Sequence, residues 1–354
     1  MEVRTARRSE RDEVLDLLSL WYDDREFFAL YNQNDRKFRD ELCLVARDRG
    51  QLVATVQIFD RAINLAGHHT PMGGIGSVFT REDYRHKGVA SDLMRLALET
   101  MEREGFEVSL LFAERLGFYN RFGWREVARK FTVLTGVAGI HTDDDFEIDV
   151  FDPARDLNAI RAIHDAYTGR LNVAAVRDED DWRGNLIFAA NQPNRPGEGS
   201  AEYFVLARKD DAPAAYLRVS RFHGVAMVME YGYRPGAVDA LLTLFRHLGE
   251  AATASPCSHR LRGDHRRGAL LREESGAAPA GVLIAHTAHD KLFESRLTAA
   301  GCPINYHEDN NYMWRVISPE RLGRRLGLPP DRAATAAFEM FRDDRSLFWT
   351  ADRF

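Results

Sequence analysis

Cysteine is scarce in this sequence, and long hydrophobic runs are absent. The three cysteines, Cys43, Cys257 and Cys302, lie far apart and without C-x-x-C spacing, so free thiols in a reducing cytoplasm are expected rather than disulfides or a metal site. No stretch approaches the roughly eighteen apolar residues that a transmembrane helix needs. The N-terminal segment also lacks the apolar core of a signal peptide. We therefore expect a cytoplasmic protein with no membrane partner.

An excess of positive charge is absent too. The 54 acidic residues outnumber the 48 lysines and arginines, so no strong positive field attracts nucleic acid, and no nucleic-acid partner is expected. Histidines are scattered, and H-E-x-x-H, P-loop and G-x-S-x-G patterns are missing, so no metal site is predicted. Gly74-Ile75-Gly76 precedes a predicted strand and has no third glycine at the right spacing, which excludes a dinucleotide fingerprint.

The most informative segment that is present begins with a predicted strand over Ile75–Thr80. A short loop follows and leads into an amphipathic helix. The loop contains Arg85, His86, Lys87, Gly88, Val89 and Ala90. A helix N-terminus favours an anion, and glycine lets a ligand approach the backbone. Cations are disfavoured at that helix end unless an anion lies there, so the loop predicts a phosphate site rather than a solvated charge cluster.

A second signal follows the next predicted strand, Val108–Phe112. It is the aromatic pattern Gly117-Phe118-Tyr119 with Phe122-Gly123-Trp124. The two motifs together, with these elements between them, resemble the GNAT superfamily of acyl-CoA-dependent N-acyltransferases. In that family the first motif cradles the pyrophosphate of coenzyme A, and a tyrosine like Tyr119 lies beside the thioester sulfur. The resemblance therefore implies acetyl-CoA as the co-substrate.

The resemblance also assigns roles in the chemistry. Backbone N–H groups around Val78, Phe79 and Thr80 would stabilise the carbonyl oxygen. Tyr119 would protonate the departing sulfur, since a phenol with a pKa near 10 stays protonated at neutral pH; a packing role against Phe122 is the alternative. The motifs name no general base. Glu114 follows the second strand and is one candidate, but a solvated loop glutamate explains it equally well.

Periodicity divides the 354 residues into several units. In the first, the helix after Ser9 precedes an irregular or helical segment, Asp23–Asp40, near the mouth of a site. Predicted strands are Val3–Ala6, Leu42–Arg47, Leu52–Ile58, Ala62–His69 and Met72–Thr80, with a hairpin at Arg49-Gly50 and with Arg125–Leu134 closing the sheet.

A second unit repeats this order of strands and helices. A strand at Phe146–Val150 and a helix at Ala154–Tyr167 precede a three-stranded meander and another helix; their ranges are Tyr203–Arg208, Ala215–Arg221, Val225–Tyr233 and Ala237–Ala252. The turn Arg234-Pro235-Gly236 lacks the spacing of the first loop, so this copy is expected to be degenerate in coenzyme binding. Beyond it we expect a strand at Met313–Ile317, helices at Pro319–Leu326 and Ala333–Phe341, and an apolar terminal strand at Ser346–Phe354.

The whole layout is similar to the enhanced-intracellular-survival type of tandem GNAT enzyme. The resemblance implies an α/β (α+β) fold of tandem GNAT-like domains, each a mixed, mostly antiparallel sheet flanked by helices, with a short C-terminal extension. The expected limits are 1–140 for the catalytic domain, 146–317 for the degenerate domain and 318–354 for the extension. The extension is too short for the family's sterol-carrier-like region, which is therefore either trimmed and begins earlier or is largely missing.

In that family the terminal carboxylate enters the active site of the first domain as a base or an amine anchor. This gives Phe354 a catalytic role beside Tyr119, and the apolar end of the chain suits burial. The family's hexameric assembly leaves a homo-oligomer open here.

The function expected is an acetyl-CoA-dependent N-acetyltransferase that acts on a primary amine of a small molecule or peptide by direct attack on the thioester. Two alternatives stay open: a related transferase with a thiol-sugar or aminoacyl-type acceptor, and a non-catalytic acyl-CoA-binding sensor. The excess of acidic over basic residues argues against a tRNA-borne substrate. The presence of both motifs in one domain argues against a non-catalytic sensor. Asp23, Asp24 and Glu26 could attract a polyamine or aminoglycoside, or simply form a solvated face.

Overall fold

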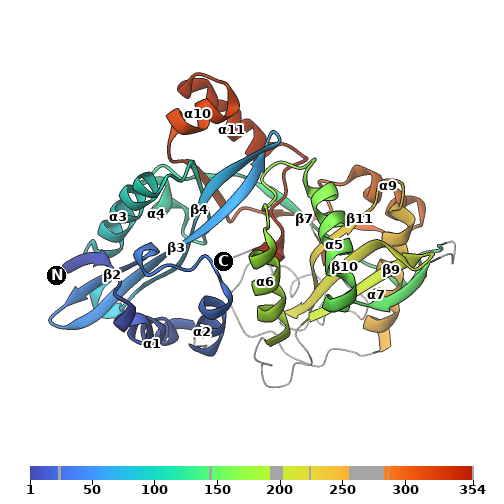
Figure 1. The fold of residues 1–354 in the computed structure, drawn as a ribbon, viewed down its shortest axis with the longest axis horizontal. Coiled ribbons are helices and arrows are strands. Elements are labelled where there is room, and N and C mark those ends of the chain that lie inside the picture. The colour runs from blue at the N-terminus through green and yellow to red at the C-terminus, as the bar shows by residue number, and fades with distance from the viewer. Residues whose placement is uncertain are drawn as a thin grey trace.

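The computed structural model describes residues 1–22, 25–142, 146–191, 202–222, 225–254, 283–285 and 287–352. These residues form two seven-stranded sheets with helices on their faces, in two lobes placed side by side (Figure 1). Each sheet is mostly antiparallel and contains one parallel pair of strands. The predicted fold class, with its mixed, mostly antiparallel sheets flanked by helices, is confirmed.

The first sheet is covered by helices on both faces. Its strand order is β1-β2-β3-β4-β5-β14-β6. The strands are β1 (Glu2–Thr5), β2 (Cys43–Asp48), β3 (Gln51–Leu65), β4 (His68–Thr80), β5 (Val108–Phe112), β6 (Arg125–Glu126) and β14 (Tyr312–Val316). Helices α1 (Arg11–Tyr22) and α2 (Arg25–Asn34) lie on one side, and α3 (Val89–Glu104) and α4 (Leu116–Asn120) on the other (Figure 1).

The hairpins of this sheet follow from local turn chemistry. Arg49 and Gly50 both have positive φ, 47° and 84°, and the hairpin predicted there is confirmed. Leu52–Ile58 and Ala62–His69 were predicted as two separate strands. That prediction is wrong, because the single strand β3 runs unbroken from 51 to 65. The polar Asp60-Arg61 step does not interrupt it, since the buried Arg61 guanidinium pairs with the Asp35 carboxylate at 2.9 Å.

The second sheet repeats the arrangement of the first. Its order is β13-β7-β12-β11-β10-β9-β8. The strands are β7 (Arg129–Leu134), β8 (Glu147–Val150), β9 (Glu202–Lys209), β10 (Ala212–Phe222), β11 (Val225–Tyr233), β12 (Leu283–Ala285) and β13 (Ile304–Asp309). The helices are α5 (Pro153–Thr168), α6 (Glu179–Asn191), α7 (Val238–Ala254) and α9 (Lys291–Ala299). The predicted strand, helix and meander of this unit are confirmed, whereas α6, β12, α9 and β13 were not predicted.

The two halves exchange one strand each. β14, from the C-terminal part of the chain, lies between β5 and β6 of the first sheet and is antiparallel to both. β7, from the N-terminal part, takes the same place between β12 and β13 of the second sheet. The prediction that Arg125–Leu134 closes the first sheet is therefore wrong beyond β6, because β14 occupies the edge of β5 with Met313 and Trp314 fully buried.

The C-terminal segment joins the two halves. Helices α10 (Pro319–Leu326) and α11 (Pro330–Arg342), both predicted, pack on the first sheet, where Trp314 stacks on Phe341 at 4.4 Å. The terminal strand predicted from Ser346 is wrong over its described residues, which form a single bridge to Asn172 and then the 3-10 helix η5 (Thr350–Asp352). The Leu347 N–H donates to the Asn172 carbonyl at 2.9 Å, and this described segment forms no ladder with a strand. The domain limits at residues 140 and 317 stay a prediction. β7 lies before residue 140 but pairs with strands of the second sheet, and β14 lies before residue 317 but pairs with strands of the first sheet.

Among the described helices, none combines the length and apolar character that crossing a membrane would require.

Candidate active site

Strands β4 and β5 pair over a short stretch and β4 then continues beyond it. Their parallel register joins Met72–Ile75 to Val108–Leu111, whereas β4 runs on to Thr80. A bulge interrupts the β3–β4 ladder in the same region, where Ser77 has a φ of 49°. Bulges of this kind re-aim the backbone of a strand. The end of β4 therefore presents backbone groups that the described β4–β5 ladder does not use.

The predicted carbonyl-binding residues lie on this end of β4. Val78 packs toward the α3 side of the sheet, and Phe79, 7% exposed, packs toward α1. Thr80 follows and is half-buried. The two anchors on opposite faces hold the strand in position, so its main-chain groups are fixed while its edge stays available.

The predicted phosphate loop leads from β4 into α3. Gly88 is the N-cap residue with a φ of 87°, a conformation that favours glycine, and a Cβ added there would meet no heavy atom within 4 Å. Behind it, the side chain of Val89 is 1% exposed and anchors the helix in the core. The first backbone N–H groups of a sixteen-residue helix thus begin at an open surface.

The cations of this loop are exposed or half-buried around the helix start. His86 and Lys87 are exposed, and His86 also has a positive φ of 62°. The Lys87 ammonium lies 5.1 Å from the centre of the Tyr84 ring, and the Arg85 Nε donates to the Thr80 carbonyl at 3.4 Å. This cationic rim complements the helix dipole for an anion.

Tyr119 lies on the same core cluster as the loop. It belongs to the short helix α4, is half-buried, and contacts Phe118 edge to face at 5.0 Å. The cluster that contains Val89 also contacts Tyr119, Phe118 and Phe122. The structure therefore brings the loop and the aromatic motif, far apart in the sequence, onto one hydrophobic support.

A hydrogen-bonded chain under the aromatic motif was missed by the sequence analysis. The Trp124 indole donates to the Ser109 hydroxyl at 3.2 Å, and that hydroxyl donates to the Gly73 carbonyl at 2.6 Å. All of this is buried, so it ties the segment after α4 to both β4 and β5 within the stretch where these strands pair. A tryptophan after Phe-Gly indicated packing, but its hydroxyl partner lies on another strand and has no local signal.

The remaining predicted residues have different outcomes. Glu114 follows β5 and is exposed, and Glu26 is exposed in the first turn of α2. Phe354, Asp23 and Asp24 lie outside the described residues. Among the described residues, no group of three histidine, cysteine, aspartate or glutamate side chains gathers as a metal site.

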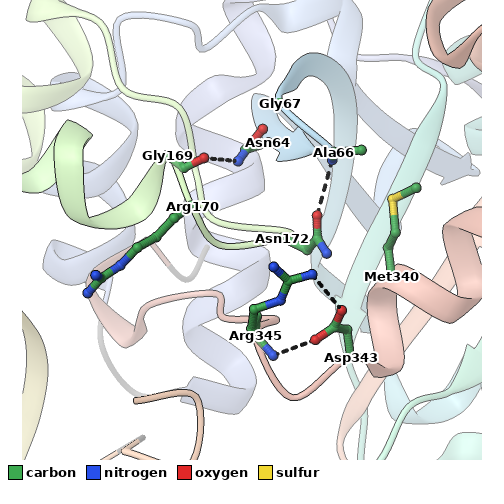
Figure 2. A pocket seen from close by; sticks show the side chains of 9 residues that line it. All are labelled: Asn64, Ala66, Gly67, Gly169, Arg170, Asn172, Met340, Asp343 and Arg345. Atoms are coloured by element: carbon green, nitrogen blue, oxygen red, sulfur yellow. Dashed lines mark hydrogen bonds and ion pairs between the residues drawn. The ribbon is translucent and has the colours of Figure 1, made fainter. Parts of the chain in front are cut away.

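A separate pocket of about 350 Å³ lies between the β3–β4 hairpin, the loop after α5 and the segment after α11 (Figure 2). Its lining residues are Asn64, Ala66, Gly67, Gly169, Arg170, Asn172, Met340, Asp343 and Arg345. Figure 2 shows its polar groups bonded to one another: the Asn172 side chain accepts from the Ala66 N–H at 3.1 Å, and Arg345 pairs with Asp343. None of the predicted site residues lines it.

The family model described as an acetyltransferase (GNAT) domain matches residues 2–127. Residues 2–127 are therefore similar to that family. No curated protein sequence matches the chain.

Solved structures resemble most of the chain, well beyond residues 2–127. A GCN5-related N-acetyltransferase from Anabaena variabilis superposes with a TM-score of 0.66 and 13% identity, over 92% of this chain and 74% of that one. Eis1 from Mycobacterium abscessus gives 0.56 and 14% identity, over 90% and 74%. Saccharomyces cerevisiae N-myristoyltransferase with bound myristoyl-CoA gives 0.53 and 12%, over 88% and 79%. These likenesses show a common fold that extends over most of the chain.

Proposed function

We propose that the protein is an acetyl-CoA-dependent N-acetyltransferase that acetylates a primary amine of a small molecule or peptide. The observation that carries the proposal is the continuous path from the bulged end of β4 into the open N-terminus of α3. Fixed backbone groups at Val78–Thr80 and an anion-favouring loop at Arg85–Ala90 occur on one strand-loop-helix unit. Tyr119 packs on the same core.

The residues of the chain fit the parts of the co-substrate. The open space at Gly88 admits a phosphate close to the backbone, and the N–H groups of the first turn of α3 favour its charge. Gly76–Thr80 continue past the β4–β5 pairing, so their backbone can bond an extended chain laid along the strand. Acetyl-CoA supplies the activated acetyl thioester.

The reaction follows from these positions. A neutral amine attacks the carbonyl carbon, the C–N bond forms, and the C–S bond breaks. A backbone N–H near Val78 stabilises negative charge on the carbonyl oxygen. Tyr119 donates its proton to the departing sulfur, and the proton lost from the amine passes to a base.

The base is assigned to the carboxylate of Phe354, with Glu114 or a water as the alternative. The described neighbours of the terminus support the first choice, because Leu347, Phe348 and Trp349 are all buried between the two halves. A carboxylate at the end of that segment is anionic at neutral pH, so it could hold an ammonium group or accept its proton.

A thiol-release assay tests the proposal. The full chain is incubated with acetyl-CoA and a panel of polyamines, aminoglycosides, peptides with free N-termini, aminoacyl-tRNA and a thiol-sugar amine, and free coenzyme A thiol is followed over time. Release that depends on both protein and a primary amine, with mass spectrometry showing one added acetyl group, is expected. Acetyl-CoA binding in calorimetry without release on any acceptor would favour the non-catalytic sensor instead.

A further inference from the structure

The pocket of about 350 Å³ beside the β3–β4 hairpin lies far from the candidate active site. The hairpin turns at Ala66-Gly67, at the opposite end of β4 from the predicted carbonyl-binding residues. At about 3.3 Å per residue, β4 spans roughly 30 Å from His68 to Val78. A small molecule in this pocket is therefore too far away to take part in acetyl transfer.

One residue of β3, Asn64, clamps the loop after α5. Its side-chain nitrogen donates to the carbonyl of Gly169 at 3.0 Å and to that of Leu171 at 2.7 Å. Its main-chain N–H donates to the carbonyl of Ala174 at 2.8 Å, and its own carbonyl accepts from the N–H of Val173 at 2.7 Å. The first half of the chain thus holds this loop of the second half through the side chain and the backbone of a single residue.

The clamped loop contains a strained backbone. Val173 has a φ of 58°, in the left-handed region that β-branched residues rarely adopt. Such strain persists only where the surrounding structure enforces it, and it is typical of ligand clamps and switch regions. The Val173 side chain is 1% exposed and packs in a core cluster of the first half. The strained residue directly follows Asn172, which lines the pocket, so the loop is held in a shape that presents Asn172 there.

Two amide groups of the pocket keep bonding capacity that the described residues do not use. Asn64 is 7% exposed, and no described donor bonds its Oδ1, which Figure 2 shows on the side of the amide away from Gly169. The Asn172 Oδ1 accepts from the Ala66 N–H at 3.1 Å, whereas no described acceptor bonds its Nδ2. The main-chain N–H of Asn172 donates to the Arg345 carbonyl at 3.1 Å, so these two lining residues are neighbours. A buried acceptor without a donor is costly, which favours a bound partner.

The charges of the lining residues favour a ligand with a negative charge. Arg345 and Asp343 form an ion pair at 3.4 Å, and the Arg345 side chain remains 67% exposed. The other charged lining residue is Arg170, whose guanidinium lies over the Tyr167 ring at 4.6 Å. One carboxylate against two guanidinium groups leaves one positive charge without a counterion among the lining residues. An anionic group on the ligand would balance it.

We propose that this pocket binds a small carboxylate that also carries a hydrogen-bond donor, as hydroxy acids and amino acids do. The ligand carboxylate accepts from the Arg345 guanidinium, a charge-assisted bond that arginine commonly forms, and from the Asn172 amide. The hydroxyl or ammonium group donates to the Asn64 Oδ1. Because both halves of the chain form the pocket, a ligand bound there stabilises their joined arrangement. This second site goes beyond acetyl transfer and does not depend on it.

Calorimetry and thermal melting of the full chain test the proposal. The probes are lactate and alanine with propionate as their parent acid, and 4-hydroxybutyrate and 4-aminobutyrate with butyrate as theirs. At least one hydroxylated or aminated acid is expected to bind and to raise the melting temperature as its concentration rises. Its parent acid and sodium chloride should not do so at the same concentration. The comparison of hydroxy with amino acids decides which of the two classes the site takes.

Two variants place the ligand in the pocket. Arg345→Met removes the guanidinium and should raise the dissociation constant about tenfold or more, because a hydrogen bond between charged groups is lost. Arg342→Met is the matched control, since Arg342 is exposed at the end of α11 and does not line the pocket. Met340→Trp fills the pocket from α11 and should abolish binding. Circular dichroism and melting without ligand establish that each variant is folded, and Met340→Trp decides the matter if Arg345→Met is not.

Two results would overturn the second site. One is that none of the four hydroxylated or aminated acids binds more tightly than its parent acid. The other is binding that Arg345→Met and Met340→Trp both leave at wild-type strength, since the ligand would then lie elsewhere on the protein. Neither result bears on acetyl transfer, which the thiol-release assay tests separately.

Discussion

At the scale of single residues, Gly88 offers the sharpest test of the coenzyme loop. Gly88→Glu adds a side chain and a negative charge where the backbone must meet phosphate. We expect calorimetry to detect no acetyl-CoA binding. Gly105→Glu is the matched control, since Gly105 caps the other end of α3, also has a positive φ, 90°, and also faces open space. Both substitutions carry the same backbone strain, so equal loss of affinity in the two variants would contradict a phosphate site at the N-terminus of α3.

Tyr119 is tested by removing a single oxygen. Tyr119→Phe keeps the ring that packs beside Phe118, so the fold and the coenzyme loop should be unaffected. Losing a general acid should lower kcat by roughly 10²–10⁴-fold with little change in acetyl-CoA affinity. Tyr306→Phe is the control, because Tyr306 lies exposed on β13 of the other sheet. A Tyr119→Phe enzyme as fast as the control would reduce Tyr119 to a packing residue.

The ionisation of Glu230 makes the free energy of unfolding depend on pH. Its burial opposes ionisation, but the charges of Arg177 and Arg218 outweigh this and lower its pKa from 4.5 to about 2. A carboxyl group with a lowered pKa in the folded state stabilises the fold above its unfolded pKa, and this contribution is lost as the pH falls from about 4.5 toward 2. A shift of this size corresponds to roughly 3 kcal/mol.

Glu230→Gln should therefore be less stable than the wild type at pH 7, because it removes the buried carboxylate that the guanidinium groups of Arg177 and Arg218 both contact. Between pH 4.5 and 3 it should lose less stability than the wild type does. Urea unfolding at pH 7, 4.5 and 3 measures both effects. Asp239→Asn is the control, since Asp239 and its partner Arg296 are exposed. Parallel losses in Glu230→Gln and the wild type over this pH range would contradict the lowered pKa.

At the scale of elements, the exchanged strands make each half depend on the other. A fragment of residues 1–140 lacks β14, so β5 and β6 lose the strand that lies between them and the core loses Met313 and Trp314. We expect this fragment, produced alone, to show no cooperative thermal transition. Produced together with residues 141–354, it should fold and co-purify through a tag on one fragment. A cooperative melt of the isolated fragment would show that β14 is dispensable.

The exchange also marks how far the sequence could predict the fold. The hairpin at Arg49-Gly50 and the start of α3 at Gly88 were predicted correctly, because turn and capping signals lie within a few residues of the structure they specify. The apolar stretches of β7 and β14 both indicate a strand. Neither says which sheet it joins, because that choice depends on which edge is free after the whole chain has folded.

The candidate site, too, could be predicted from the sequence only in part. The loop and the aromatic motif were found by spacing along the chain, whereas the bulge at Ser77 carries no local signal. Arg177, Glu230 and Asp352 belong to no sequence motif, and only the fold brings them together in the interior. Such non-local networks are invisible to periodicity, because each member is predicted as a solvated side chain on its own.

At the scale of the whole molecule, the two halves are joined by the exchanged strands and by residues 346–352. Leu347 and Trp349 belong to the core of the second half, and Phe348 belongs to that of the first. If the proposed role of the Phe354 carboxylate holds, a change at Phe354 should affect catalysis without affecting either core.

Extending the chain after Phe354 tests the proposed role of its carboxylate. Adding Gly-Ser-Gly after Phe354 moves the carboxylate away from that residue and changes none of the described residues of the 346–352 segment or of the coenzyme loop. We expect turnover to be lost, since the base or amine anchor is displaced, with normal acetyl-CoA affinity and a normal melting temperature. The same three residues added before Met1 are the control. If the C-terminal extension acetylates at the rate of the N-terminal one, the terminus has no part in the reaction, and Glu114 or a bound water must accept the proton of the amine.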